Sequence, residues 1–118
     1  DEVGLFTPTF VLDVSPAGIR EATWAAEDFG LVTRSSADRP ALLATDATAS
    51  AACIRSVLDS EPGPRREIVV LNAAALLWAA GRATDLREAT QLATAAIDSG
   101  QARSVLERLQ VASHASEA

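Results

Sequence analysis

The hydrophobic positions near the start of the chain are mostly β-branched or aromatic, which is typical of β-structure. Residues 7–14 are rich in β-branched and aromatic side chains, which favour strands. Residues 15–18 read Ser-Pro-Ala-Gly, a turn in which Pro16 fixes φ and Gly18 can adopt a positive φ. Residues 19–25 then resume a β-like composition. We therefore expect an antiparallel hairpin with a loop of about four residues, followed by a polar loop up to Pro40.

From Leu42 onward the apolar spacing indicates about four helices. Asp46 and Asp85 are typical N-cap residues, and Gly81 is typical of the position just after a helix. The predicted helices cover residues 47–59, residues 65–80, the segment between Asp85 and Ser99, and residues 101–113.

The second predicted helix is apolar around most of its circumference, which indicates a central, buried helix. Asn72 lies inside it and would need hydrogen-bond partners. The first helix has a narrower apolar stripe. Its members are Ser50, Cys53, Ile54, Val57 and Leu58.

Composition narrows the possible functions. Among 118 residues the formal net charge is -6, and the ten basic residues are scattered arginines, so we expect no nucleic-acid partner. No apolar run reaches the ~18 residues of a membrane span, so we expect no membrane partner. The single cysteine, Cys53, rules out an internal disulfide and fits a reducing cytosol.

Few residues are candidates for chemistry. Cys53 is most simply a small core residue, and His114 lies in a tail that we expect to be frayed. Arg65 and Arg66 lie at a helix start, where their charge opposes the helix dipole, so a partner carboxylate or a ligand is conceivable. Asp1 and Glu2 are adjacent carboxylates, the hard oxygen ligands that Mg²⁺ prefers, although an acidic dipeptide alone is more often solvated charge.

One segment carries a family resemblance. Residues 63–75 read Gly-Pro-Arg-Arg-Glu-Ile-Val-Val-Leu-Asn-Ala-Ala-Ala, which closely resembles the late helix of anthranilate phosphoribosyltransferases. Further segments match that family in order and spacing, so the resemblance covers essentially the whole chain. These segments are Pro8-Thr9 and residues 27–31, 78–83, 96–100 and 106–109.

The resemblance implies an α/β fold. The chain would be the carboxy-terminal part of a nucleoside phosphorylase/phosphoribosyltransferase-type α/β domain. It forms a single fragment, with a β-hairpin region over residues 1–31 and a helical region over residues 41–115. The implied reaction transfers phosphoribosyl from phosphoribosyl pyrophosphate to anthranilate in tryptophan biosynthesis. In that family an Asp-Glu pair at the positions of Asp1 and Glu2 helps to bind the Mg²⁺ that accompanies phosphoribosyl pyrophosphate.

The resemblance also implies what lies elsewhere. The family's Gly-rich pyrophosphate loops, anthranilate contacts and dimer-forming helices precede this segment, so the partners would be the remaining amino-terminal part and, for the parent enzyme, a second copy in a homodimer. The chain has no methionine and begins at Asp1. We therefore expect an excised or processed piece of a cytoplasmic enzyme. Its two carboxylates would be poorly held at a free end, and the chain alone would be inactive.

Three departures from the family pattern leave alternatives open. Ala44-Thr45-Asp46 replaces a Gly-Gly-Asp, Ser50-Ala51 replaces an Asn-Ala, and Phe6-Thr7 replaces a Thr-Gly. A divergent phosphoribosyltransferase or nucleoside phosphorylase-like enzyme with another substrate would fit them. A non-catalytic scaffold domain that retained the fold is the third possibility.

Overall fold

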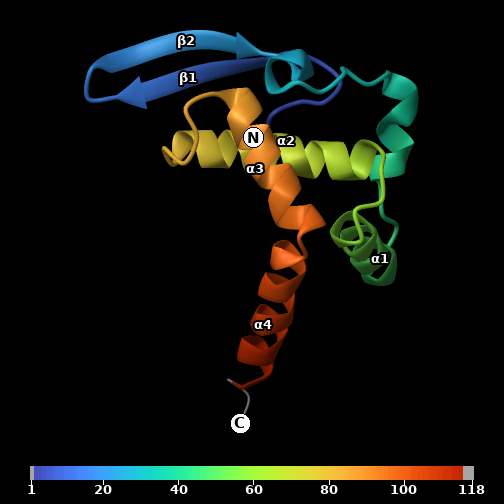
Figure 1. The fold of residues 1–118 in the computed structure, drawn as a ribbon. Helices are drawn as coiled ribbons and strands as arrows, with labels where there is room; N and C mark the ends of the chain where they lie inside the picture. The colour runs from blue at the N-terminus through green and yellow to red at the C-terminus, as the bar shows by residue number, and fades with distance from the viewer. Residues whose placement is uncertain (1, 116–118) are drawn as a thin grey trace.

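A computed structural model describes residues 2–115 and shows a β-hairpin followed by helices (Figure 1). This order is the predicted one, and the predicted fold class is confirmed. The elements in chain order are β1 (Thr9–Ser15), β2 (Gly18–Trp24), the 3₁₀ helices η1 (Ala26–Phe29) and η2 (Ser36–Leu42), α1 (Ala47–Leu58), α2 (Pro64–Ala79), α3 (Leu86–Asp98) and α4 (Gln101–Ala115).

The hairpin turn is tighter than the sequence predicted. Ser15 pairs with Gly18 in the antiparallel ladder, so only Pro16 and Ala17 form the turn instead of about four residues. Gly18 can join the ladder because its φ of 127° is open to glycine but strained for other residues. The Ser15 Oγ also accepts a hydrogen bond from the Ala17 amide at 3.2 Å, which stabilises the short turn.

The predicted polar loop before Pro40 is only partly a loop. Residues Ser36–Leu42 form η2, and the Ser35 hydroxyl accepts a hydrogen bond from the Ala37 amide at its start. The loop ahead of it is tied down by Arg34, which makes two hydrogen bonds to the Glu67 carboxylate on α2, at 2.7 and 2.5 Å. The sequence missed η2 because a 3₁₀ helix has no 3.6-residue apolar period.

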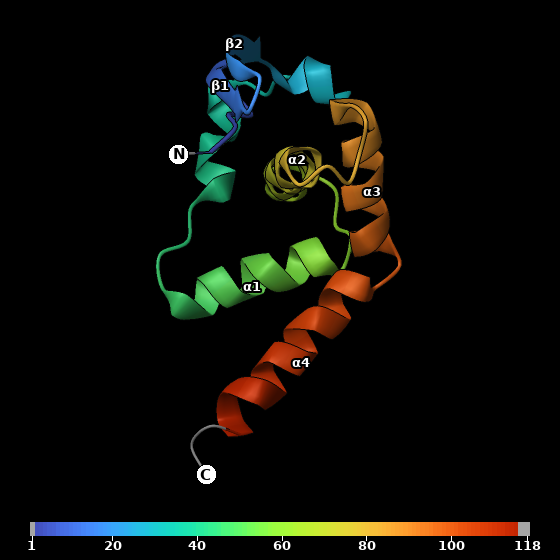
Figure 2. The same cartoon turned by 90° about the vertical axis from the view of Figure 1, so that its left-hand side faces the viewer.

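Helix α2 is the central element, as predicted. Figure 2 views α2 nearly end-on, with the hairpin, α3 and α1 around it. Leu71 and Ala74 on α2 are fully buried. Trp24 at the end of β2 stacks edge-on against Trp78 of α2 and Phe29 of η1, with ring centroids 5.2 and 5.6 Å apart. The main core therefore joins the hairpin base, η1, α2 and α3. Its buried members are Val3, Leu5, Ala26, Phe29, Leu71, Ala74 and Ala89.

The helix ends follow the predicted capping residues. The Asp46 carboxylate accepts from the Ala49 amide at 2.7 Å, and the Asp85 carboxylate accepts from the Glu88 amide at 2.8 Å. The Glu88 carboxylate accepts hydrogen bonds from the amide and the hydroxyl of Thr84, both at 2.7 Å. In a capping box it would instead accept from the amide of the N-cap residue, Asp85. These caps satisfy amides that a helix cannot pair internally.

Helices α1 and α4 lie at the periphery. On α1 the predicted stripe is only partly correct: Val57 is buried and Cys53 and Leu58 are half-buried, but Ser50 and Ile54 are exposed. The buried residue of α1, Val57, lies near its C-terminal end, and its first turns are exposed or half-buried. Helix α4 points away from the rest (Figure 1), and none of its described residues is buried.

The hairpin leaves one apolar face open. Phe10, Leu12, Val14 and Ile19 alternate along the strands onto the same face and are each more than half exposed. The accessible surface is 7916 Å², against about 6100 Å² for a typical folded monomer of 12.3 kDa. The radius of gyration is 15.9 Å, against about 13.5 Å for a compact domain of this length. The chain thus exposes roughly 1800 Å² more surface than a compact domain of its mass.

No single helix within residues 2–115 has the length and apolar composition needed to cross a membrane. Helices η2 and α1 reach that length and composition only when they are taken together, and they are bent by 109° relative to each other.

Candidate metal site

The segment after Glu2 lies against α2 and is held there by Asn72. The Val3 amide donates to the Asn72 Oδ1 at 2.8 Å, and the Asn72 Nδ2 donates to the Val3 carbonyl at 3.1 Å. The same Nδ2 donates to the carbonyl of Ile68, one turn earlier on α2, at 3.0 Å. One side chain therefore satisfies both backbone groups of Val3, as a neighbouring strand would.

Two further contacts fix the next residues. The Gly4 amide donates to the Thr9 Oγ1 at 2.8 Å, and the Leu5 carbonyl accepts from the Arg34 amide at 3.1 Å. A Cβ on Gly4 would lie 2.7 Å from the Thr7 carbonyl oxygen, so only glycine fits there without movement. The side chains of Val3 and Leu5 are buried in the core. The backbone directly after Glu2 is therefore well held, while the expectation that the carboxylates of Asp1 and Glu2 are poorly held stays a prediction.

Glu2 itself is exposed and lines two clefts. One cleft, of about 880 Å³, lies between the hairpin and the C-terminal half of α2 and is also lined by Thr9, Asn72 and Trp78. The other, of about 580 Å³, lies between residues 4–7 and η2. The carboxylate of Glu2 therefore stands where both clefts can reach it.

Two acidic groups that follow the hairpin, Glu27 and Asp28, already accept hydrogen bonds. The Glu27 carboxylate accepts from the Thr33 amide and hydroxyl at 3.0 and 2.9 Å, and these bonds hold the pKa of Glu27 below its usual value. The Asp28 carboxylate accepts from the Ala25 amide at 2.8 Å. Within residues 2–115, no group donates a hydrogen bond to the Glu2 carboxylate. Its oxygens are therefore open to a cation.

The donor chemistry fits Mg²⁺. A single exposed carboxylate with open oxygens suits an ion that keeps several waters and shares its remaining positions with substrate phosphates. Asp1, the other predicted ligand, lies outside the described residues. Residues 2–115 contain no cluster of three or more metal-binding side chains, and Glu2 is the one of the two predicted ligands that the structure describes.

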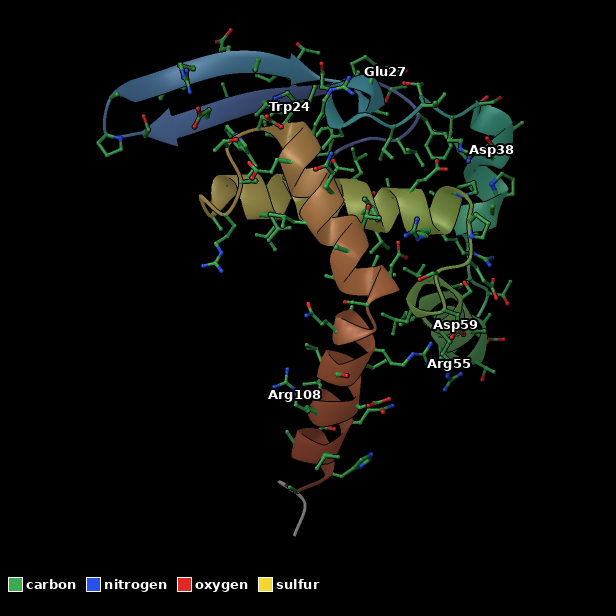
Figure 3. All side chains as sticks on the ribbon, in the orientation of Figure 1. Trp24, Glu27, Asp38, Arg55, Asp59 and Arg108 are labelled. Atoms are coloured by element: carbon green, nitrogen blue, oxygen red, sulfur yellow. The ribbon has the colours of Figure 1, made fainter. Side chains whose placement is uncertain are left out.

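A cation that the sequence did not single out also lines the second cleft. The Arg39 guanidinium on η2 lies 5.0 Å from the centre of the Phe6 ring, a cation–π contact, and both residues line the cleft that Glu2 enters. Sequence reasoning missed Arg39 because it is one of ten scattered arginines. Figure 3 shows two others, Arg55 and Arg108, on α1 and α4, away from the hairpin.

The other residues considered from the sequence are Arg65, Arg66, Cys53 and His114. Arg65 donates from Nε to the Ala41 carbonyl at 2.6 Å. Arg66 pairs with the Asp98 carboxylate at 2.6 Å, so one of the two arginines has the partner carboxylate considered from the sequence. Cys53 lines an apolar groove of about 340 Å³ between α1 and α2. His114 lies on an exposed turn of α4, which is helical there instead of frayed.

Asp98 joins three segments. Its carboxylate accepts from the Ser60 hydroxyl at 2.8 Å and from Arg66 at 2.6 Å. The Ser60 hydrogen bond and then the Arg66 hydrogen bond hold the pKa of Asp98 below its usual value. This contact ties the end of α3 to the connection between α1 and α2, and it lies far from Glu2 in the chain.

Comparison with known proteins supports the resemblance found in the sequence. The chain is 47% identical over 109 residues to the anthranilate phosphoribosyltransferase of Trichlorobacter lovleyi, covering 92% of this chain and 30% of the relative. It is 42% identical over 114 residues to that of Symbiobacterium thermophilum, covering 97% and 33%. It is 44% identical over 109 residues to the anthranilate phosphoribosyltransferase of Rhodopseudomonas palustris, covering 92% of this chain and 31% of the relative. The chain thus spans about a third of the length of these curated relatives.

The family match covers most of the chain. Residues 1–103 match the family described as "Glycosyl transferase family, a/b domain". The matched residues include the hairpin, η1, α2 and α3, which contribute to the main core around Leu71. The chain therefore belongs to the glycosyl transferase family, within its a/b domain.

Proposed function

We propose that this chain is the carboxy-terminal part of the α/β domain of an anthranilate phosphoribosyltransferase. The whole enzyme would transfer the phosphoribosyl group of phosphoribosyl pyrophosphate to the amine of anthranilate, releasing pyrophosphate, in tryptophan biosynthesis. The identity of 38–47% over at least 92% of the chain supports this proposal. The observation that carries it is Glu2, an open carboxylate on a firmly held segment between two clefts.

Asp1 and Glu2 would hold Mg²⁺ in the whole enzyme. When bound, the ion neutralises the pyrophosphate leaving group and orients it. Glu2 would supply one oxygen ligand, while the hydrogen bonds on Val3 and Gly4 keep its backbone in place. Arg39 in the second cleft offers a positive charge for a phosphate group near the same carboxylate. The anthranilate contacts would come from outside this chain.

The chain's main partner would be the remaining amino-terminal part of the enzyme. The exposed hairpin face and the excess of roughly 1800 Å² of surface support this proposal, since stable obligate interfaces bury areas of that size. The homodimer and a cytoplasmic location belong to the same proposal and rest on the family resemblance. The 118-residue chain alone would have no transferase activity, because its share of the site is one edge.

The test uses the longest natural polypeptide that contains these residues. Its affinity for phosphoribosyl pyrophosphate should depend on Mg²⁺, and this dependence should disappear in the double variant Asp1→Asn/Glu2→Gln. Glu21→Gln is the matched control, because Glu21 is exposed in the middle of β2 and lines neither cleft. An unchanged Mg²⁺ dependence in the double variant would refute the metal role, and anthranilate consumption by the 118-residue chain alone would refute its predicted inactivity.

A further inference from the structure

We infer that Asn72 is a positioning residue for the metal-binding carboxylate of Glu2. The inference rests on the proposed function, since it concerns the same site, but it assigns a role to a residue on a helix 69 positions away from the segment it holds. In the proposed site, Asn72 touches neither Mg²⁺ nor substrate. It acts through the backbone of Val3.

The geometry of the contact favours this role. Asn72 presents one acceptor and one donor to the amide and carbonyl of Val3, at 2.8 and 3.1 Å. A side-chain amide carries an uncharged acceptor and an uncharged donor on neighbouring atoms, and asparagine is shorter than glutamine, the other residue with this group. Alanine would remove both contacts, and aspartate would place a second acceptor against the Val3 and Ile68 carbonyls.

The support behind Asn72 is rigid. Its Nδ2 also bonds the Ile68 carbonyl of its own helix, which fixes the amide plane. The adjacent Leu71 is fully buried in the core cluster of α2. Helix α2 is the central element of the fold, so the position of Asn72 is set by the packing of the whole core.

The hold on Val3 reaches Glu2 through the peptide bond. The Val3 N–H belongs to the planar unit that runs from the Glu2 Cα to the Val3 Cα. A hydrogen bond to that N–H therefore restricts where the Glu2 Cα can lie. Without it, the backbone at Glu2 would be free to take other positions. Supporting residues of this kind change metal affinity because they orient the ligands.

Thr9 provides a second anchor, which is farther from Glu2. Its Oγ1 accepts from the Gly4 amide, one residue farther from Glu2. Thr9→Val keeps the shape of the side chain and removes only this acceptor. If Asn72 and Thr9 both position Glu2, the Thr9 variant should loosen the segment less than the Asn72 variant does.

The experiment compares Asn72→Ala, Thr9→Val and Glu2→Gln in the longest natural polypeptide that contains these residues. Mg²⁺ affinity is measured by calorimetric titration with Mg²⁺ alone, and hydrogen exchange of the Val3 and Gly4 amides is followed without metal. The matched control is Thr90→Ala, which removes a buried hydroxyl that bonds the Leu86 carbonyl on α3 and does not touch residues 2–5.

We expect Asn72→Ala to weaken Mg²⁺ binding about 10–100-fold, as outer-shell partners do, and to speed exchange at Val3. Thr90→Ala should change neither. An Mg²⁺ affinity in Asn72→Ala within twofold of wild type, while Glu2→Gln weakens it, overturns the inference and leaves the proposed metal role intact. An equal loss in Thr90→Ala also overturns it, because the effect would then be general destabilisation. If Glu2→Gln itself has no effect, the metal role fails first, and the positioning role fails with it.

Discussion

Leu71 and Leu76 offer a matched test of the fold, because they are the same residue type on the same helix in opposite environments. Leu71 is 0% exposed, whereas Leu76 is 70% exposed and lines the open cleft beside the hairpin. Replacing each with alanine removes the same atoms. Any difference between the two variants therefore reports burial and packing, and not the chemistry of the substitution.

The expected magnitude follows from the surroundings of Leu71. Its cluster includes Val3 and Leu5 from the start of the chain, Phe29 from η1 and Ala89 from α3. Three segments thus join α2 in this cluster, and none can close the space without moving a held backbone. Leu71→Ala should cost ~2–5 kcal/mol in the free energy of unfolding, toward the upper end. Leu76→Ala should change it by less than about 0.5 kcal/mol.

The assay is urea unfolding followed by circular dichroism and by tryptophan fluorescence. Trp24 and Trp78 report on the same core, because they stack against each other at its edge. The urea midpoint should fall in Leu71→Ala while the m-value stays constant. For a chain of this length, each kcal/mol corresponds to about 4 °C in the melting temperature, so a shift of ~8–20 °C is expected.

Two results would refute the reasoning. A cost below about 1 kcal/mol for Leu71→Ala would mean that the position is not core. Equal costs for the two variants would mean that α2 is not oriented as described. In a longer natural polypeptide the cost of Leu76→Ala should rise, since the proposed partner segment would cover that face.

Three further predictions concern the surface and the helix ends. The pKa of Asp98 is lowered on folding, so the stabilisation from its carboxylate is present above the unfolded pKa near 4 and is lost as the pH falls through the folded pKa. When the pH is lowered from 5 to 2, the free energy of unfolding in urea should therefore fall less for Asp98→Asn than for the wild type. Asp46→Ala should cost ~0.5–2 kcal/mol in urea unfolding through the lost cap of α1, whereas Glu61→Ala should cost little. Val14→Thr, on the exposed hairpin face, should reduce concentration-dependent self-association in sedimentation velocity.

Each of these has a result that contradicts it. The same acid sensitivity in Asp98→Asn and wild type would remove that carboxylate from the pH dependence. Equal midpoints for the Asp46 and Glu61 variants would mean that the cap adds nothing. Sedimentation that does not depend on the residue at position 14 would place any association elsewhere on the chain.

Much of the secondary structure was predictable because its signals are local. Asp46 and Asp85 mark helix starts by bonding amides three residues away, and Gly81 ends α2 at a φ of 67°. The hairpin followed from its β-branched residues and its Pro-Ala turn. The sequence missed η2, which lacks a helical apolar period. It also overrated the stripe of α1, in which Ser50 and Ile54 are exposed.

The candidate site was predictable only in part. Glu2 was named from its chemistry and from the family resemblance, and Asn72 was expected to need polar partners. Neither the pattern nor the resemblance indicated that Asn72 bonds Val3, or that Thr9 holds Gly4. The crowding that makes Gly4 necessary comes from the Thr7 carbonyl, which is close only in the folded chain.

The sequence by itself determined which segments become strands and helices, where most of them end, and which family the chain resembles. These features depend on residues within a few positions of each other. The tertiary structure decided that the segment after Glu2 lies against the middle of α2, and that the Glu2 carboxylate stands between two clefts. Such contacts join residues as far apart as Val3 and Asn72, and they form only when α2 is packed in the core.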